Sequence, residues 1–241
     1  MLQNNPKQKN GSVHKKDFFQ IRATEQVFIC AREVVGKFRL KDAFLLDEPA
    51  EMVVRTLSCS PAELREILFK IQSRHNWVFC HMIKVALISA VISAFFGYDE
   101  KNRQTLCAGG LYHDIGKLFI PAEILQKTGP LCGYEMEIMR RHSSLGYEYV
   151  KTLDIDDEIK DIILTHHERL DGSGYPAGIT GEKIREKAGI VMVADVLDAV
   201  TSRRPYREPG SADAAFEIIS GAKKRFPPRL AEYFKSLTAI P

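Results

Sequence analysis

The sequence predicts an all-α helical bundle with a short, helical extension at its N-terminus. Along most of the chain, apolar residues recur with the spacing of one helix face. No sustained two-residue alternation of the kind that marks a strand is present, and no internal repeat. With 241 residues, of which 45% are hydrophobic, the chain exceeds one typical domain and can bury one sizeable core beside an appendage.

The first sixty residues carry the weakest structural signals. Residues 1–16 are polar and rich in Asn, Gln and Lys, so we expect a disordered tail. Residues 17–60 mix short apolar clusters with charges, and we expect helices there in a region of unassigned type. This region is too short for a receiver domain, which needs about 120 residues.

Residues 61–241 are predicted to form the main helical domain. Its start is marked by Ser60-Pro61-Ala62-Glu63, which has the order of an N-cap, a first-turn proline and a capping-box glutamate. Leu64, Ile67, Leu68 and Ile71 then follow the rhythm of an amphipathic helix. Further helices are expected at about 78–97, 102–116, 133–152, 157–170, 182–202, 211–222 and 228–237.

The apolar segment 78–96 has roughly the length of a membrane span, which needs about 20 residues. It carries His81 and Lys84 in its first third, which leaves a short uncharged run. We therefore interpret it as a buried core helix and expect no membrane span.

Charge and cysteine content exclude several other classes. Four of the 34 basic residues lie in the first sixteen, which leaves 30 against 31 acidic residues, so a nucleic-acid-coating domain is not indicated. The five cysteines never form a CxxC spacing, which argues against a disulfide framework and a thiolate zinc site. No secretory signal pattern is present, and we expect a cytoplasmic protein.

Several ionisable residues fall on faces that the helical pattern predicts to be buried. The stripe of Ile159, Ile162 and Ile163 continues onto His166 and His167. By the same spacing, His142 shares a face with Ile138, Leu145 and Tyr149, and His81 shares one with Val85, Ile88 and Ile92. Asp195 lies in the apolar run GIVMVADVLDAV, where an unpaired carboxylate would cost several kcal/mol.

Convergence of these residues predicts a metal site. A lone histidine on an apolar stripe is usually a satisfied core residue, but here several helices direct imidazoles and carboxylates inward. The candidate ligands are His81, His113, Asp114, His142, His166, His167 and Asp195. They are more than one ion needs, so we expect two divalent metal ions. Mixed nitrogen and oxygen ligation suits iron or manganese, with zinc, nickel and cobalt as alternatives.

Five motifs then occur in one order over more than half the chain. They are His81; LYHDIGKLFIP with His113-Asp114 and Lys117; RRHSSLG with His142; HHERLDGSGYP with His166-His167 and Gly174-Tyr175-Pro176; and VADVLDAVTSRRPYR with Asp195. In this combination the segment from about 78 to 210 strongly resembles the HD-GYP branch of the HD-domain phosphohydrolases.

This resemblance implies an HD-domain helical bundle that hydrolyses the bacterial second messenger cyclic di-GMP. The product would be pGpG, and often GMP, formed through a metal-bridging hydroxide at a two- or three-metal centre. Asp114, next to His113, would bridge the ions, with His81 and Asp195 in one coordination sphere and His142, His166 and His167 in the other. The residues that stand where the family contacts its substrate are Lys117, Tyr175, Asp198, Arg204 and Arg207.

Lys117 also has a catalytic interpretation from its spacing. If the helix continues through Gly116, its ammonium group lies on the face of Asp114, where it could stabilise charge or donate a proton.

One departure from the family concerns the metal count. Three-metal members carry a glutamate one turn before the first histidine, whereas this chain has Trp77, so we favour two metals. Gly109-Gly110 and Ser143 also differ from common family residues, without changing a ligand.

Two other functions stay open at this point. One is an HD phosphohydrolase that acts on another nucleotide, and the other is a receptor that binds cyclic di-GMP without turnover and signals through a protein partner. The substituted Trp77 and the unassigned region 17–60 keep the receptor open. We expect a cyclic dinucleotide as ligand rather than a nucleic-acid polymer, and a homodimer is compatible with the sequence.

Overall fold

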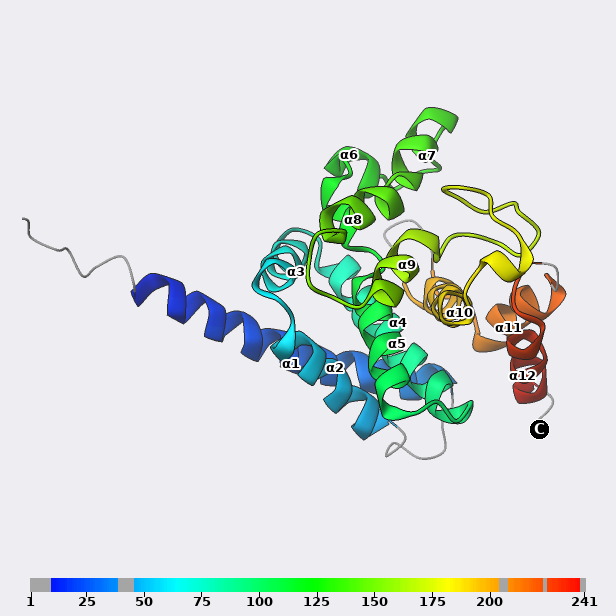
Figure 1. Cartoon of the computed structure of the whole chain (residues 1–241), viewed down its shortest axis with the longest axis horizontal. Helices are drawn as coiled ribbons and strands as arrows, with labels where there is room; N and C mark the ends of the chain where they lie inside the picture. Colours follow the sequence, from blue (N-terminus) through cyan, green and yellow to red (C-terminus); the bar gives the residue numbers. More distant parts are fainter. Residues whose placement is uncertain (1–9, 39–45, 204–207, 223–224, 239–241) are drawn as a thin grey trace, which may run out of the picture.

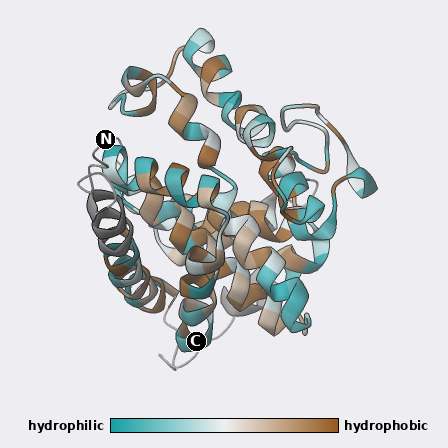
Figure 2. Cartoon of the chain, turned by 60° about the vertical axis from the view of Figure 1, so that its left-hand side comes forward, coloured by the Kyte–Doolittle hydropathy of each residue, from teal (hydrophilic) through white to brown (hydrophobic). Residues whose placement is uncertain are grey.

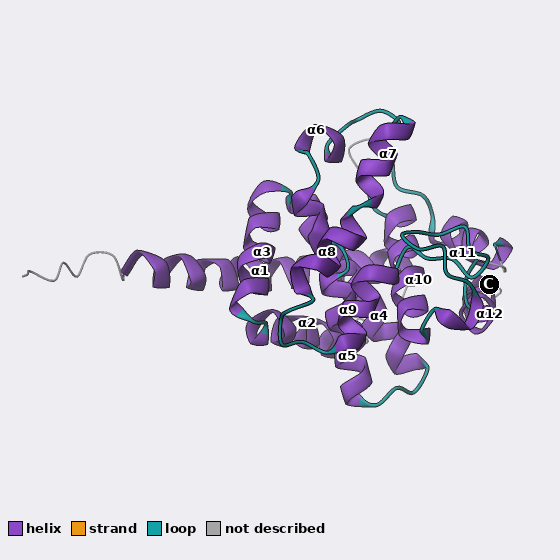
Figure 3. Ribbon diagram, turned by 45° about the horizontal axis from the view of Figure 1, so that its top comes forward, coloured by secondary structure: helices purple, strands orange, loops and turns teal. Residues whose placement is uncertain are grey.

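The structure, a computed structural model, describes residues 10–38, 46–203, 208–222 and 225–238, and this part contains helices and loops but no strand (Figures 1 and 3). The α-helices are α1 (Asn10–Phe38), α2 (Asp47–Cys59), α3 (Ala62–Arg74), α4 (Asn76–Phe95), α5 (Glu100–Tyr112), α6 (Ala122–Leu125), α7 (Gly133–Arg140), α8 (His142–Val150), α9 (Asp157–Thr165), α10 (Glu186–Thr201), α11 (Ala212–Gly221) and α12 (Pro228–Thr238). Two 3-10 helices are η3 (Ile115–Phe119) and η4 (Gly181–Lys183). The predicted all-α class is confirmed.

Helix α4 is the centre of the bundle. It packs against α1, α2, α3, α5 and α10, and hydrophobic residues gather in the middle of the bundle (Figure 2). By length and composition α4 could cross a membrane, but 78% of its most apolar stretch is buried inside the protein. A helix that is apolar on all sides needs neighbours on all sides, as α4 has.

The N-terminal extension is helical. Helix α1 begins at Asn10, so residues 10–16 are helical where the sequence predicted a disordered tail. A helix extends easily once it has been nucleated, and α1 is anchored further along the chain by its buried side. That side consists of Phe19, Ala23, Val27, Cys30, Ala31 and Val34. The N-terminal end of α1 projects away from the bundle (Figure 1).

The predicted capping role of Ser60 is wrong. Helix α3 begins at Ala62 with Pro61 at its N-cap, and no side chain caps it. The buried hydroxyl of Ser60 instead lies 2.6 Å from the carbonyl oxygen of Thr56 and 2.5 Å from the hydroxyl of Tyr112. Ser60 directly follows α2, so its side chain faces that helix and the core.

Several helices are shorter than predicted, and three of the breaks fall at candidate ligands. The helix expected at 102–116 stops at Tyr112 and is followed by η3. The helix expected at 133–152 divides into α7 and α8. The helix expected at 157–170 ends at Thr165, and the one expected at 182–202 begins at Glu186. Apolar spacing continues through these breaks, which explains why periodicity did not reveal them.

A close backbone contact brings η3 against α8. A Cβ atom added to Gly116 would lie 1.8 Å from the carbonyl oxygen of His142 and 2.6 Å from the amide nitrogen of Gly146. Only glycine allows this approach, because both obstructing atoms belong to the backbone. The contact sets the spacing between the segment after α5 and the first turn of α8, which both carry candidate ligands.

We predict that Gly116→Ala destabilises the fold strongly. The added methyl group forces η3 and α8 apart, and the free energy of unfolding should fall by about 3 kcal/mol, the upper end of typical overpacking costs. Gly129→Ala is the matched control, because an added Cβ there meets nothing within 4 Å. Urea titrations that show equal stability for the two variants would contradict the proposed close contact.

Candidate metal centre

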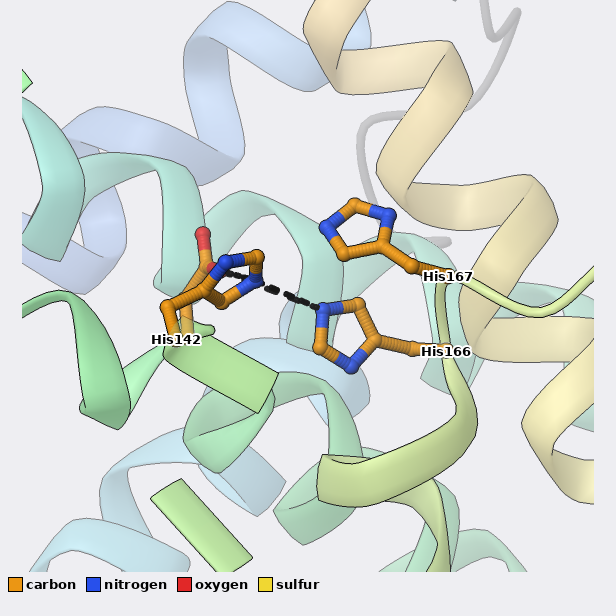
Figure 4. A group of neighbouring side chains, drawn as sticks. His142, His166 and His167 are labelled. Atoms are coloured by element: carbon orange, nitrogen blue, oxygen red, sulfur yellow. Dashed lines mark hydrogen bonds and ion pairs between the residues drawn. The ribbon is translucent and has the colours of Figure 1, made fainter. Parts of the chain in front are cut away.

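The structure brings all seven predicted ligands together from five helical segments. His81 lies in α4, His113 and Asp114 follow α5, His142 begins α8, His166 and His167 follow α9, and Asp195 lies in α10. Six of these residues are buried, and His167 is partly exposed. Figure 4 shows three of the rings converging from α8 and the end of α9.

Asp114 stands at the centre of the cluster, because its two carboxylate oxygens face different neighbours. Its Oδ2 lies 3.4 Å from His81 Nε2 and 3.2 Å from His113 Nε2. Its Oδ1 lies 3.2 Å from His142 Nε2 and 4.0 Å from His166 Nε2. The potential ligand atoms therefore form two groups that share Asp114.

Asp195 connects the two groups on the opposite side. Its Oδ1 lies 3.1 Å from His81 Nε2, and its Oδ2 lies 3.9 Å from His167 Nδ1. Asp114 and Asp195 therefore each lie close to histidines of both groups. This arrangement is common where two metal ions are bound side by side.

Backbone carbonyl groups fix the orientation of three rings. The Nδ1 atoms of His113, His142 and His166 lie 2.8, 2.7 and 3.0 Å from the carbonyl oxygens of Gly110, Met139 and Ile163, respectively. Because a carbonyl only accepts a hydrogen bond, each Nδ1 carries a proton, and in the neutral ring each Nε2 presents its lone pair to the centre. Metal-ligating histidines are commonly held in this way.

The Nε2 atoms of His142 and His166 lie 3.3 Å apart (Figure 4). With protons on both Nδ1 atoms, these two nitrogens present lone pairs to one another and cannot form a hydrogen bond between neutral rings. Among the described residues, His113 Nε2 and Asp114 Oδ1 are also buried without a hydrogen-bond partner. Such a set of inward lone pairs suits a divalent metal ion, which would satisfy all of them.

The charge states also suit metal binding. Burial, together with the neighbouring histidines, holds the pKa of His166 and of His167 well below the ordinary value of 6.5. Burial alone would raise the pKa of Asp114, but His113 and Lys117 hold it well below its ordinary range. At neutral pH His166 and His167 are therefore neutral imidazoles and Asp114 is an ionised carboxylate, the forms that bind cations.

Lys117 lies next to Asp114, although not for the predicted reason. Helix α5 does not continue through Gly116, so the expected α-helical spacing is wrong. Lys117 instead lies in the 3-10 helix η3, where residues three apart are eclipsed. Its Nζ is 2.5 Å from Asp114 Oδ2, and its side chain is 11% exposed at the edge of the site.

Tyr175 covers the same site from the loop that follows α9. Its ring stacks on His167, with centroids 4.6 Å apart and planes 30° apart, and the guanidinium of Arg140 lies 5.5 Å from its centroid. The buried Glu168 holds this loop, because its carboxylate accepts hydrogen bonds from the backbone amides of Ala177 and Ile179. Sequence reasoning gave Glu168 no role, and its place directly after His166-His167 was the available signal.

The predicted substrate contact of Asp198 is not supported by its position. Its side chain is buried on the far side of His81, where Oδ2 lies 2.6 Å from His81 Nδ1 and Oδ1 accepts a hydrogen bond from Ser202 Oγ at 2.5 Å. Both carboxylate oxygens of Asp198 are therefore engaged, one by a candidate ligand and the other by Ser202. The other two predicted substrate contacts, Arg204 and Arg207, lie outside the described residues.

Comparisons with known proteins agree with this geometry. A family model described as HD domain matches residues 64–230. A cyclic di-GMP phosphodiesterase of Thermotoga maritima is 36% identical over 88% of this chain and 59% of its own length. The 3'3'-cGAMP-specific phosphodiesterase 2 of Vibrio cholerae is 33% identical over 67% of this chain and 32% of its own length.

A similar fold occurs in the solved structure of Bd1817, a HDG"Y"P protein from Bdellovibrio bacteriovorus. It covers 98% of this chain and 74% of its own, with a TM-score of 0.59 at 18% identity. The chain spans less than two thirds of the length of the two relatives above. The family match and the assembled His and Asp residues show that this chain belongs to the HD-domain family, in its HD-GYP branch.

Proposed function

We propose that this chain is a metal-dependent phosphodiesterase that hydrolyses cyclic di-GMP. The observation that carries the proposal is the position of Asp114, whose two buried oxygens face two groups of histidines. Relatives named as cyclic di-GMP phosphodiesterases, such as the one from Thermotoga maritima, support this choice of substrate.

We further propose that the site holds two divalent ions, with iron or manganese as the preferred metals. Asp114, His81, His113 and Asp195 would hold one ion, and Asp114, His142, His166 and His167 the other. When bound, a pair of such cations lowers the pKa of a water molecule and neutralises charge on phosphoryl oxygens. Donor atoms from imidazole and carboxylate suit both metals.

The chain's own residues supply the remaining chemistry. Lys117 places a donor-only ammonium group at the edge of the site, where it can stabilise a phosphate oxygen or protonate the leaving alkoxide. Tyr175 presents an aromatic ring beside His167 against which a guanine base can stack. The first product would be pGpG, and a second cleavage would give GMP.

A second candidate substrate is 3'3'-cGAMP. The Vibrio cholerae relative carries this specificity in its name and is 33% identical to this chain. Both cyclic dinucleotides present two phosphodiesters and at least one guanine, so the site chemistry described above serves either. A receptor that binds without turnover is the third candidate.

The proposed function predicts turnover that depends on the shared carboxylate. Protein purified without oxygen and supplied with Mn²⁺ should convert cyclic di-GMP to pGpG or GMP, as resolved by chromatography. Asp114→Asn should reduce this rate at least about a hundredfold. The neutral amide is a weaker metal ligand than the carboxylate, and both groups of ligands share this residue. Metal content of each variant should be measured by elemental analysis in the same preparation.

Lys183→Met serves as the matched control, because Lys183 is an exposed residue of η4. It should leave the rate unchanged. A substrate panel that includes 3'3'-cGAMP separates the two enzyme candidates. Absence of turnover of any cyclic dinucleotide by the metal-loaded protein would contradict the enzyme proposal, and tight binding in that case would favour the receptor.

The metal-free protein should lose stability in mild acid. Because the pKa of His166 and of His167 is depressed in the folded chain, the unfolded chain takes up protons that the folded chain does not. The stability present above about pH 6.5 should therefore fall, as pH decreases, by about 1.4 kcal/mol per pH unit for each histidine.

Urea titrations between about pH 7 and pH 5 would measure this slope. His166→Gln should reduce it by about the contribution of one proton, whereas an equal slope in the variant would contradict the assignment of a neutral, buried imidazole.

A further inference from the structure

A chain of hydrogen bonds runs from the N-terminal helix α1 to the candidate ligand His81. Lys37 Nζ, near the end of α1, donates to Ser202 Oγ at 2.7 Å. Ser202 Oγ donates to Asp198 Oδ1 at 2.5 Å, and the other oxygen of Asp198 lies 2.6 Å from His81 Nδ1. Two groups, the Ser202 hydroxyl and the Asp198 carboxylate, therefore separate α1 from the metal centre.

The direction of these hydrogen bonds is fixed by chemistry. An ammonium group has no acceptor, so Lys37 obliges Ser202 Oγ to accept and leaves the hydroxyl proton for Asp198. An ionised carboxylate only accepts, so Asp198 Oδ2 accepts a hydrogen bond from the Nδ1–H group of His81. In the neutral ring this leaves the Nε2 lone pair facing Asp114 and Asp195. The orientation of Lys37 is thus transmitted to the ring of His81.

A second contact from α1 supports the same region. Glu33 lies one helical turn before Lys37, and its Oε2 is 2.5 Å from Nζ of Lys84 in α4. The Lys84 side chain is only 9% exposed, and its Nζ is also 3.5 Å from Ser202 Oγ. Without Glu33, this mostly buried ammonium group would lose its closest carboxylate partner.

Glu33 and Lys37 lie outside the part of the chain that the family model matches, whereas their partners Lys84 and Ser202 lie within it. That match begins at residue 64, whereas α1 ends at Phe38. Helix α1 is nevertheless packed along α4, and its opposite end projects from the bundle (Figure 1). A movement of α1 along or around its axis would withdraw Lys37 from Ser202.

We propose that α1 helps to position the metal ligands. Lys37 acts as a positioning residue that orients His81 through Ser202 and Asp198. This inference rests on the metal centre of the proposed function and adds a role for the N-terminal extension. Metal retention then depends on the position of α1, so displacement of α1 would increase the rate of metal release.

Metal release provides the test, and it requires no nucleotide. The full chain and three variants, Lys37→Met, Lys37→Arg and Arg32→Met, would be loaded with Mn²⁺ and challenged with excess chelator, with retained manganese measured over time by elemental analysis. Arg32 is the matched control, because it is an exposed cation on the same helix. The unfolding temperature of each metal-free protein would be measured in parallel.

We expect Lys37→Met to release manganese about three- to tenfold faster than the unaltered chain, less than the 10- to 100-fold typical of a direct partner of a ligand. Lys37→Arg keeps a charged donor and should restore most of the retention, and Arg32→Met should match the unaltered chain. The unfolding temperatures of the metal-free Lys37 and Arg32 variants should agree.

Equal release by Lys37→Met and the unaltered chain would overturn the role of α1 while leaving the metal centre intact. A lower unfolding temperature for Lys37→Met without faster release would also overturn it, because it would show a purely structural role. Failure of the unaltered chain to retain any Mn²⁺ would overturn the metal centre itself, and the proposed function with it.

Discussion

The buried carboxylate of Asp114 is the constraint on which the rest of the structure depends. Four histidine nitrogens and the ammonium group of Lys117 surround its two oxygens. A carboxylate at this depth is tolerable only with such partners, since burial without them would cost several kcal/mol. The bundle therefore has to deliver those partners from separate helices, and the short contact at Gly116 is one device by which it does so.

Helix ends position most of the candidate ligands and orient three of the imidazole rings. His113, Asp114, His142, His166 and His167 all lie at or just beyond an end of a helix, and His81 and Asp195 lie within helices. At a helix end the nearby carbonyl groups are free to accept, and three of them hold the Nδ1 atoms of ligand histidines. The same positions that interrupt the helices thus orient the imidazoles.

The sequence predicted the members of the cluster better than the course of the backbone. The stripe of Ile159, Ile162 and Ile163 pointed correctly to His166 and His167, because burial follows the helical period up to the last turn. The close approach of η3 to α8 is a tertiary backbone contact at Gly116, which no local pattern encodes. The position of Asp198 behind His81, and the contact between Lys37 and Ser202, join residues far apart in the chain and needed the fold.

Calorimetric titration of the metal-free chain with Mn²⁺ tests the two-cation centre most directly. Two groups of ligands sharing Asp114 predict two equivalents bound per chain, with little proton release near neutral pH because the imidazoles of His166 and His167 are already neutral. Binding of a single equivalent, or of none, would contradict the assignment of a pair of cations to this cluster.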